Sequence, residues 1–374
     1  MRLAVLRETL EGERRVAIVP ESLRRLAAKK IQVAVEGGAG AASFFADDDY
    51  RAMGGTVEAR DALAATADVF IQIRPPSAAD AGKLRAGAAL VSAIYPSLNG
   101  ELVRALAARR VTAFAIDLIP RSTAAQMMDV LSSQATAAGY QAVVMAAAAL
   151  PRFFPMLMTA AGTIAPARVL ILGAGVAGLT AIGTARRLGA VVEAFDVRSV
   201  VKEQVESLGA KFVEVSSSED AQTAGGYAKE ASDEYKQRQA AAIAEHAVKA
   251  DVVICTALIP GRRAPLLLTK EVVRRMRPGS VVVDLAAEQQ GNCELTTPGE
   301  TVMDHGVTIV GDLNYASHVA LHASQMYSRN MEKLLLHLTK DGALDVDLTD
   351  EITAACLVTH EGAVVRPTAN ETRP

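Results

Sequence analysis

Short runs of apolar residues alternate along the N-terminal third of the chain with segments whose apolar residues recur every three to four positions. The short runs predict β-strands, and the segments at 21–30 and 100–110 predict helices between them. Because strands that alternate with helices form parallel sheets with helical crossovers, this block is predicted to be α/β. The runs that predict its strands are residues 3–6, 31–36, 68–73, 89–95 and 111–119.

A second block of the same kind follows an alanine-rich segment. Pro120 ends the first block, and residues 124–150 are predicted to form one long helix because alanine is the strongest helix former. Pro151, Pro155 and Pro166 then mark a connection. The strands predicted for the second block are residues 168–172, 191–196, 211–215, 250–257, 280–286 and 307–312.

The C-terminal segment is too short to form a domain of its own. It is predicted to contain a helix at 317–338 and a β-hairpin within 351–365 that turns at Glu361-Gly362, and we expect it to fold back on the first block. The sequence therefore predicts an α/β protein of two Rossmann-like domains with parallel sheets that flank a cleft. The N-terminal domain would be discontinuous, with residues 1–125 plus 315–374, and the second domain would hold residues 126–314.

The composition is that of a globular protein. Of 374 residues, 50% are hydrophobic and 22% charged, and the net charge of −3 does not favour nucleic acid or a membrane surface. Residues 130–151 lack charge but include Ser, Thr and Gln, so they predict a buried helix rather than a membrane span. Residues 1–15 carry charges where a signal peptide is apolar, and Cys255, Cys293 and Cys356 fit no metal or disulfide spacing. We expect a soluble protein in a reducing compartment.

The glycines at the start of the second block predict a dinucleotide-binding turn. Gly173, Gly175 and Gly178 form a G-x-G-x-x-G between an apolar strand at 168–172 and a helical pattern at 179–188. The first glycine permits the tight turn, the second lets the backbone approach the pyrophosphate, and the third lets the helix lie close to the strand. The helix start, at Val176, would offer unpaired N–H groups to the phosphates.

Asp196 ends the next predicted strand, about 20 residues after the glycines, where it can accept hydrogen bonds from both ribose hydroxyls. Its charge would repel a 2′-phosphate and favours NAD(H) over NADP(H). Arg198 opposes that preference, because an arginine can pair with such a phosphate. Val197 is a candidate cofactor-binding residue with them. Leu258 is predicted to pack on the dinucleotide, and the alternative is an ordinary strand-to-loop turn there.

A row of polar residues lies at the start of the alanine-rich helix, after Arg121. Steps of three residues place Gln126, Asp129 and Ser132 on one side of a helix, where they would line a cleft. However, Thr123 and Gln126 match a capping box, which is the favoured interpretation of Gln126 from the pattern alone. Asp129 would then serve only to complement the helix dipole.

Other segments give weaker signals for chemistry. Gly225, Gly226 and Tyr227 lie in a long connection, where the glycines would hinge a lid or the segment would be a surface crossover. The histidines show no zinc-binding pattern, so no metal is predicted. Neither a G-x-S-x-G nor a Cys–His arrangement supports a covalent nucleophile.

These motifs resemble those of the alanine dehydrogenase and transhydrogenase α-subunit family along nearly the whole chain. The most similar member is the NAD(H)-binding domain I of proton-translocating NAD(P) transhydrogenases. The resemblance rests on the segments at 15–20, 120–121, 126–134, 223–230, 256–261 and 291–293. Residues that line the nicotinamide end in that family match Arg121, Gln126, Asp129 and Ser132. Of these, Gln126 and Asp129 are the catalytic candidates.

The resemblance also implies that Gly226 and Tyr227 belong to a mobile loop that closes over NAD(H), and that the chain is a homodimer. Alanine dehydrogenases activate an α-keto acid with a lysine and a histidine, whereas the matching positions here hold Arg74 and Tyr95. An arginine is a poor proton shuttle, and tyrosine lacks the near-neutral pKa of histidine. The carboxylate of the dehydrogenase site matches Glu288. These departures argue against amino-acid oxidation.

The function that the resemblance implies is that of the NAD(H)-binding component of a transhydrogenase, which passes hydride between NADH and NADP⁺. One G-x-G-x-x-G and the lack of spanning stretches place the NADP(H)-binding subunit and the membrane-spanning subunit on other chains. We expect a cytoplasmic chain, peripheral on the inner face of the cell membrane. The alternatives are an alanine-dehydrogenase-like NAD-dependent oxidoreductase and a non-catalytic NAD-binding module.

Overall fold

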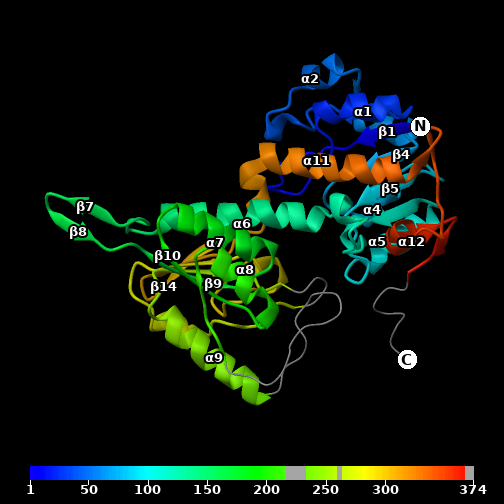
Figure 1. The fold of residues 1–374 in the computed structure, drawn as a ribbon. Coiled ribbons are helices and arrows are strands. Elements are labelled where there is room, and N and C mark those ends of the chain that lie inside the picture. The colour runs from blue at the N-terminus through cyan, green and yellow to red at the C-terminus, as the bar shows by residue number, and fades with distance from the viewer. Residues whose placement is uncertain (216–232, 259–262, 367–374) are drawn as a thin grey trace. The chain divides into compact units, whose positions relative to one another are not determined.

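The computed structural model describes residues 1–215, 233–258 and 263–366. The chain divides into two compact units: unit 1 is Met1–Gln134 with Ser317–Pro374, and unit 2 is Ala135–Ala316 (Figure 1). The first boundary falls inside helix α6 (Val130–Ala149), after Gln134, nine residues beyond the expected boundary after residue 125. Each unit contains a sheet rich in parallel strands, so the predicted α/β class is confirmed.

In its described residues, unit 1 contains an eight-stranded sheet in the order β19-β18-β6-β5-β4-β1-β2-β3. Strands β1 to β6 are parallel, whereas β18 and β19 are antiparallel at one edge. The strand order reverses at β1, because β2 and β3 lie on one side of it and β4 to β6 on the other. The strands are β1 (Arg2–Val5), β2 (Gln32–Glu36), β3 (Thr56–Glu58), β4 (Val69–Ile71), β5 (Ala89–Ser92), β6 (Thr112–Ala115), β18 (Leu357–His360) and β19 (Ala363–Val364).

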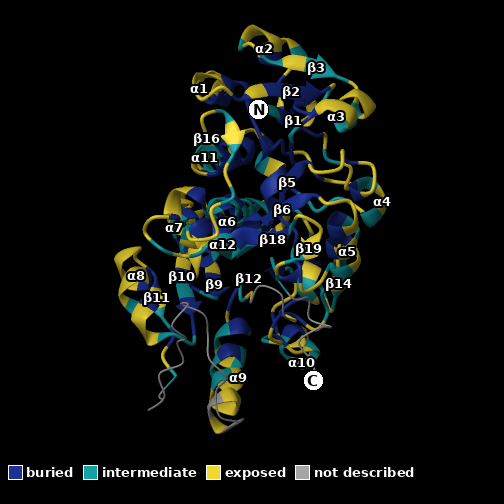
Figure 2. Ribbon diagram, turned by 90° about the vertical axis from the view of Figure 1, so that its right-hand side faces the viewer, coloured by how far each residue is buried: buried dark blue, intermediate teal, exposed yellow. Residues whose placement is uncertain are grey.

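Helices cover both faces of this sheet, which explains why its strands are almost continuously apolar and buried (Figure 2). Because strand side chains alternate, Leu3 and Val5 pack with α1 and α11 on one face, while Ala4 packs with α3 and α5 on the other. The helices of unit 1 are α1 (Leu23–Ala28), α2 (Asp47–Ala52), α3 (Arg60–Thr66), α4 (Ala78–Ala81), α5 (Gly100–Ala108), α11 (Ala320–His337) and α12 (Glu351–Cys356). A small hairpin of β16 (Thr339–Lys340) and β17 (Ala343–Leu344) follows α11.

Unit 2 contains, in its described residues, a seven-stranded sheet in the order β11-β10-β9-β12-β13-β15-β14, antiparallel only at β14. Its strands are β9 (Arg168–Leu172), β10 (Val191–Phe195), β11 (Lys211–Phe212), β12 (Val252–Cys255), β13 (Val281–Asp284), β14 (Thr301–Asp304) and β15 (Val307–Val310). A separate hairpin pairs β7 (Leu157–Thr159) with β8 (Gly162–Ile164).

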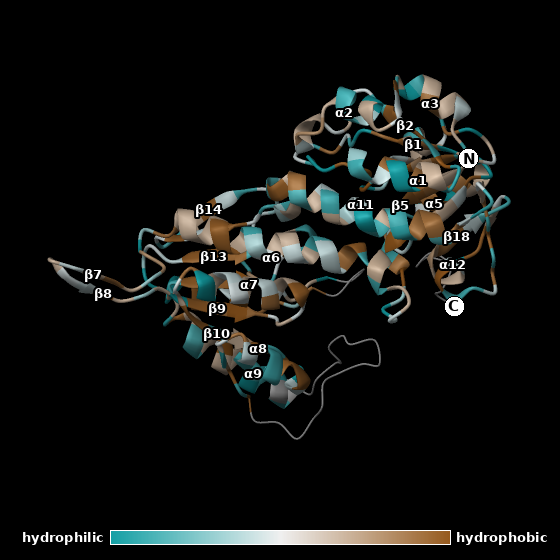
Figure 3. Cartoon of the chain, turned by 45° about the horizontal axis from the view of Figure 1, so that its top comes forward, coloured by the Kyte–Doolittle hydropathy of each residue, from teal (hydrophilic) through white to brown (hydrophobic). Residues whose placement is uncertain are grey.

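The sheet of unit 2 is also covered on both faces, and its central strands are among the most hydrophobic parts of the chain (Figure 3). Val169 and Ile171 pack on α6 and α7, whereas Leu170 and Leu172 pack with residues of α9 and α10. The helices are α7 (Val176–Arg187), α8 (Lys202–Ser207), α9 (Asp233–Ala247) and α10 (Lys270–Arg274). Because the central strands β10, β9, β12 and β13 are parallel, their carboxyl ends lie at the same edge of the sheet, and the glycine turn lies at that edge.

Two helix predictions need correction. The alanine-rich helix begins at Val130 rather than near 124, because Gln126–Met128 form a separate 3₁₀ turn. Residues 351–356, expected to be β-rich, form α12, whose N-cap Asp350 accepts a hydrogen bond from Thr353 N–H at 2.7 Å. The hairpin that turns at Glu361-Gly362 is confirmed by the pairing of β18 with β19.

Candidate dinucleotide site

The glycine turn joins β9 to α7 in unit 2. Gly173 has φ +104°, and a Cβ there would lie 2.7 Å from Thr256 Oγ1. A Cβ at Gly178 would overlap the carbonyl oxygen of Gly173, so the helix could not start so close to the strand. Gly175 is exposed and a Cβ there would meet nothing within 4 Å, which leaves its backbone open to a ligand.

The first turn of α7 is free to receive an anion. Among the described residues, no side chain caps this helix at Gly175, and Val176 is 39% exposed. The first N–H groups of a helix lack partners within it, and the helix dipole is positive at that end. The turn and the helix start together form the arrangement that binds a pyrophosphate in Rossmann-type sites.

Asp196 follows β10 and lies beside the glycine turn. Its carboxylate accepts hydrogen bonds from Ala174 N–H at 2.7 Å and from Arg198 N–H at 2.9 Å. The Arg198 guanidinium also donates to both of its oxygens, Nε to Oδ1 at 2.9 Å and Nη2 to Oδ2 at 2.8 Å. These bonds raise the pKa of Arg198 above its ordinary value. Arg198 therefore reduces the negative charge that Asp196 presents to a ribose or to a 2′-phosphate.

A residue that sequence reasoning missed supports the turn from the neighbouring strand. Thr256 follows β12, and its hydroxyl donates to the carbonyl oxygen of Gly173 at 2.9 Å. Leu258, two residues further on, is 39% exposed and is thus available for contact at this edge. A threonine directly after a strand that neighbours the glycine strand was the only sequence signal for this support.

The structure thus brings together, in unit 2, the candidates Gly173, Gly175, Val176, Gly178, Asp196, Val197, Arg198 and Leu258. Gly226 and Tyr227 lie outside the described residues. Three further candidates are exposed or half-buried in unit 1 near the start of α6: Arg121, Gln126 and Ser132. Asp129 is also half-buried there.

The local contacts of these unit 1 residues revise the capping interpretation. Asp129, not Gln126, caps α6: its carboxylate accepts Ser132 N–H at 3.0 Å and Ser132 Oγ–H at 2.6 Å. The capping box predicted at Thr123 is wrong, because the turn at Gln126 has Ala125 as its N-cap with no side-chain hydrogen bond. Within the described residues, the exposed Gln126 side chain makes no hydrogen bond. Its amide is free for another role.

Unit 1 holds a buried cluster of charges that compensate one another. The Glu13 carboxylate accepts from Arg15 Nε at 2.7 Å, Arg74 Nε at 3.1 Å and Ser317 Oγ at 2.6 Å. Burial by itself would raise the pKa of Glu13, but the hydrogen bonds and charge of Arg15 bring it well below its ordinary value. Arg74 is thus engaged by a carboxylate of its own chain.

Glu8 follows β1 and holds the end of β4. Its carboxylate accepts the N–H groups of Ile73 at 2.6 Å and Arg74 at 3.1 Å. Although some of the residue is exposed, burial of the carboxyl group raises its pKa to about 7, and the charge of Glu13 adds to that shift. The Glu8 carboxyl group therefore titrates near neutral pH at the carboxyl edge of the unit 1 sheet.

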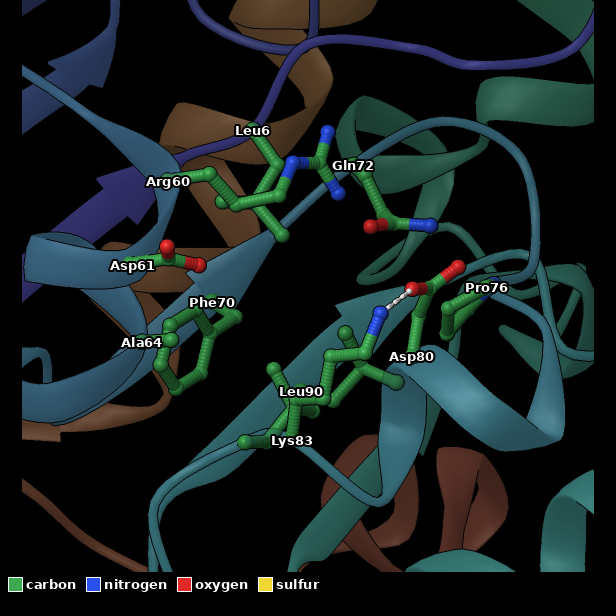
Figure 4. Close-up of a pocket in the computed structure, with 11 residues that line it drawn as sticks. Leu6, Arg60, Asp61, Ala64, Phe70, Gln72, Pro76, Asp80, Lys83 and Leu90 are labelled. Atoms are coloured by element: carbon green, nitrogen blue, oxygen red, sulfur yellow. Dashed lines mark hydrogen bonds and ion pairs between the residues drawn. The ribbon is translucent and has the colours of Figure 1, made fainter.

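A small cavity lies next to the reversal of strand order in unit 1 (Figure 4). Its volume is about 70 Å³, against roughly 300–1,000 Å³ for most ligand pockets. Phe70 and Leu90 line it, and Lys83 donates to Asp80 at 2.9 Å beside it. It is too small for a dinucleotide and is not the predicted site.

Residues 1–215, 233–258 and 263–366 contain no group of three or more His, Cys, Asp or Glu side chains that could hold a metal. In the same ranges, no helix is both long enough and apolar enough to cross a membrane.

Comparison with known proteins agrees with this geometry. Residues 4–138 match the model of the alanine dehydrogenase/PNT N-terminal domain, and residues 142–367 match that of the alanine dehydrogenase/PNT C-terminal domain. The chain belongs to the alanine dehydrogenase/PNT family. It is 47% identical to an NAD(P) transhydrogenase subunit alpha chain of Rhodospirillum rubrum over 98% of each chain. It is 30% identical to alanine dehydrogenase of Mycobacterium tuberculosis over 98% of this chain and 95% of that one.

Solved structures of the alanine dehydrogenase/PNT family have the same fold. A transhydrogenase from Sinorhizobium meliloti superimposes with a TM-score of 0.90 at 46% identity, covering 97% of this chain and 100% of that one. An L-alanine dehydrogenase superimposes with a TM-score of 0.83 at 26% identity, covering 99% and 98%. These transhydrogenase chains are thus more similar to this protein than the alanine dehydrogenases are.

Proposed function

We propose that this chain is the NAD(H)-binding component of a proton-translocating transhydrogenase, and that hydride passes between its NAD(H) and the NADP(H) of a partner subunit. The observation that carries the proposal is the 47% identity to a Rhodospirillum rubrum transhydrogenase subunit alpha chain over 98% of both chains. The chain also matches a longer subunit alpha, from Cereibacter sphaeroides, over only 71% of that protein.

The charge cluster of unit 1 supports transhydrogenation over amino-acid oxidation. A keto acid would need a cation for its carboxylate and a proton donor for its carbonyl group. Arg74 is paired with Glu13, and position 95 holds a tyrosine rather than a histidine, the usual proton donor near neutral pH. Transfer of hydride between two nicotinamides requires no proton transfer at carbon, so such groups are not needed.

Bound NADH would supply the hydride. In unit 2, the glycine turn would hold the pyrophosphate and Asp196 the ribose, with Leu258 packed on the dinucleotide. We assign the nicotinamide end to residues of unit 1, with Gln126 and Asp129 as the catalytic candidates and Arg121 and Ser132 beside them. Their work is to orient the reactants and exclude water.

The assembly that follows from this proposal is a homodimer that docks with an NADP(H)-binding subunit and a membrane-spanning subunit. The chain would be cytoplasmic, peripheral on the inner face of the cell membrane. It would be active only with these partners, because its own described residues provide one glycine turn of the dinucleotide type.

The decisive experiment mixes this chain with a purified NADP(H)-binding subunit of a transhydrogenase. The chain alone should bind NADH and show no turnover, whereas the mixture should exchange hydride between NADH and an NADP⁺ analogue followed by absorbance. Failure of exchange with both nucleotides bound would refute the proposal. A parallel assay with NADH, pyruvate and ammonia should show no turnover above background. Robust turnover there would favour an alanine dehydrogenase instead.

A further inference from the structure

We infer that Asn292 is a positioning residue for the dinucleotide: its amide fixes the end of β12, which carries Thr256 and Leu258, against the glycine turn. The inference rests on the proposed binding of NAD(H) to unit 2. Asn292 lies in the loop after β13 and is fully buried.

The side chain of Asn292 joins both ends of the connection that follows β12. Its Nδ2 donates to the carbonyl oxygens of Ala257 and Pro265, each at 2.8 Å. Its Oδ1 accepts the N–H of Ala257 at 3.2 Å. One amide therefore satisfies both backbone groups of the residue that precedes Leu258.

The backbone of Asn292 is fixed just as firmly. Its N–H donates to Asp284 Oδ2 at 2.8 Å, and its carbonyl oxygen accepts the N–H groups of Leu267 at 2.8 Å and Leu268 at 3.0 Å. Asp284 ends β13 and also accepts Thr296 Oγ–H at 2.7 Å. The position of the amide is thus set by the sheet itself.

A continuous set of contacts links this amide to the phosphate-binding turn. Ala257 follows Thr256 directly, and the Thr256 hydroxyl donates to Gly173 O at 2.9 Å. Thr256 N–H donates to Leu172 O at 2.8 Å. Loss of the amide would release the backbone that holds Thr256 against the turn and Leu258 at the surface.

Only asparagine provides this set of donors and acceptors in the available space. Aspartate has the same shape, but one of its oxygens would face the carbonyl oxygens of Ala257 and Pro265. Alanine would leave the half-buried N–H and carbonyl groups of Ala257 without these partners. Both variants should therefore move the end of β12 while leaving the rest of the sheet in place.

The test compares NADH affinity, measured by calorimetry, with thermal stability. Asn292→Ala and Asn292→Asp should weaken NADH binding by on the order of tenfold, the usual effect of losing such hydrogen bonds. The matched control is Val282→Ala, in the buried centre of β13, which removes packing from the same sheet but none of these bonds. It should lower the melting temperature at least as much and change NADH affinity less than about twofold. Equal loss of affinity in the control would mean that Asn292 acts through stability alone.

A double-mutant cycle with Leu258→Ala provides the second readout. If Asn292 acts by holding Leu258 in place, the double variant should bind NADH with about the same affinity as whichever single variant binds NADH more weakly. Additive losses would overturn the inference, as would an unchanged affinity in Asn292→Ala while the wild type binds NADH. A wild-type chain that binds no NADH would refute the proposed function as well, so the two failures are distinguishable.

Discussion

The sheets of the two units have similar architecture, but the residues at their carboxyl edges differ in kind. In unit 1, charged side chains beyond the strands bond within the unit: Glu8 accepts backbone N–H groups at the end of β4, and Glu13 pairs with Arg15 and Arg74. In unit 2, glycines follow β9, and the start of α7 has no side-chain cap. The unit 1 edge therefore carries the Glu13 ion pairs, whereas the unit 2 edge, although it holds the Asp196–Arg198 pair, also leaves backbone donors at the start of α7 for a ligand. Two sheets with similar strand orders can thus differ in role, because the few residues that follow their strands either bond to one another or remain available for a ligand.

The strongest test of the unit 2 edge is Gly178→Ala. The added Cβ would overlap the carbonyl oxygen of Gly173, so the turn should open and NADH affinity should fall by about 100-fold or more, roughly 3 kcal/mol. Gly183→Ala is the matched control in the same helix, since its Cβ would meet only Arg187 Nη1 at 3.7 Å. Calorimetric titration should show full affinity for that control, and a similar loss in both variants would contradict the steric argument.

At the unit 1 edge, Glu8 should make the free energy of unfolding depend on pH. The pKa of Glu8 is raised from 4.5 to about 7 in the folded chain, so the folded state binds the proton more tightly than the unfolded state. Protonation of Glu8 thus favours folding, and its contribution should be full below pH 4.5, decline as the pH rises to about 7, and stay constant above it. Relative to Glu8→Gln, the wild type should lose at most about 3 kcal/mol over that interval.

Urea unfolding of the full chain at several pH values, in wild type and in Glu8→Gln, measures this difference in the free energy of unfolding. Glu13→Gln is not a suitable control, because it would also unpair Arg15 and Arg74. Asp48→Asn, in the exposed first turn of α2, keeps the cluster intact and should leave the slope unchanged. Parallel pH profiles for wild type and Glu8→Gln would show that the carboxyl group has an ordinary pKa.

Asp196→Ala should weaken NADH binding by about 1–3 kcal/mol, because the ribose hydroxyls would lose their acceptor. Arg198 sharpens this test, since it shares the carboxylate in the free chain. Arg198→Ala should keep NADH affinity within a few-fold and weaken NADPH binding further, because the remaining carboxylate would be unshielded. Tighter binding of NADPH than of NADH by the wild type would contradict the assignment of cofactor.

The smallest expected effect concerns Gln126, whose exposed amide caps nothing. Gln126→Asn shortens the side chain by one methylene, so stability and NADH affinity should hardly change. If the amide helps to orient the nicotinamide end, hydride exchange with the NADP(H)-binding subunit should fall severalfold. Unchanged exchange would remove Gln126 from the site.

The buried central strands and the glycine turn were predictable from the sequence because their signals are local, whereas the short edge strands β3 and β14 were not predicted. Runs such as 168–172 and 281–284 are apolar at nearly every position, which a strand covered on both faces requires. The start of α6 was not predictable from alanine content. The start of the helix depends on which residue accepts hydrogen bonds from its first free N–H groups. Asp129 does so here, and helix propensity does not distinguish Asp129 from an earlier residue.

By itself, the sequence determined the α/β class, the order of most of the buried strands and the position of the glycine turn, since each follows from periodicity or from residues close together in the chain. Only the tertiary structure decided which polar groups meet. The bonds of Asn292 to Ala257 and of Thr256 to Gly173 join residues far apart in sequence, because β9, β12 and β13 are neighbours in the sheet. The bond of Glu13 to Ser317 likewise depends on the return of the C-terminal segment to unit 1. Hydrogen bonds and ion pairs act over a few ångströms, so their partners are set by strand order and side-chain direction, which no local pattern records.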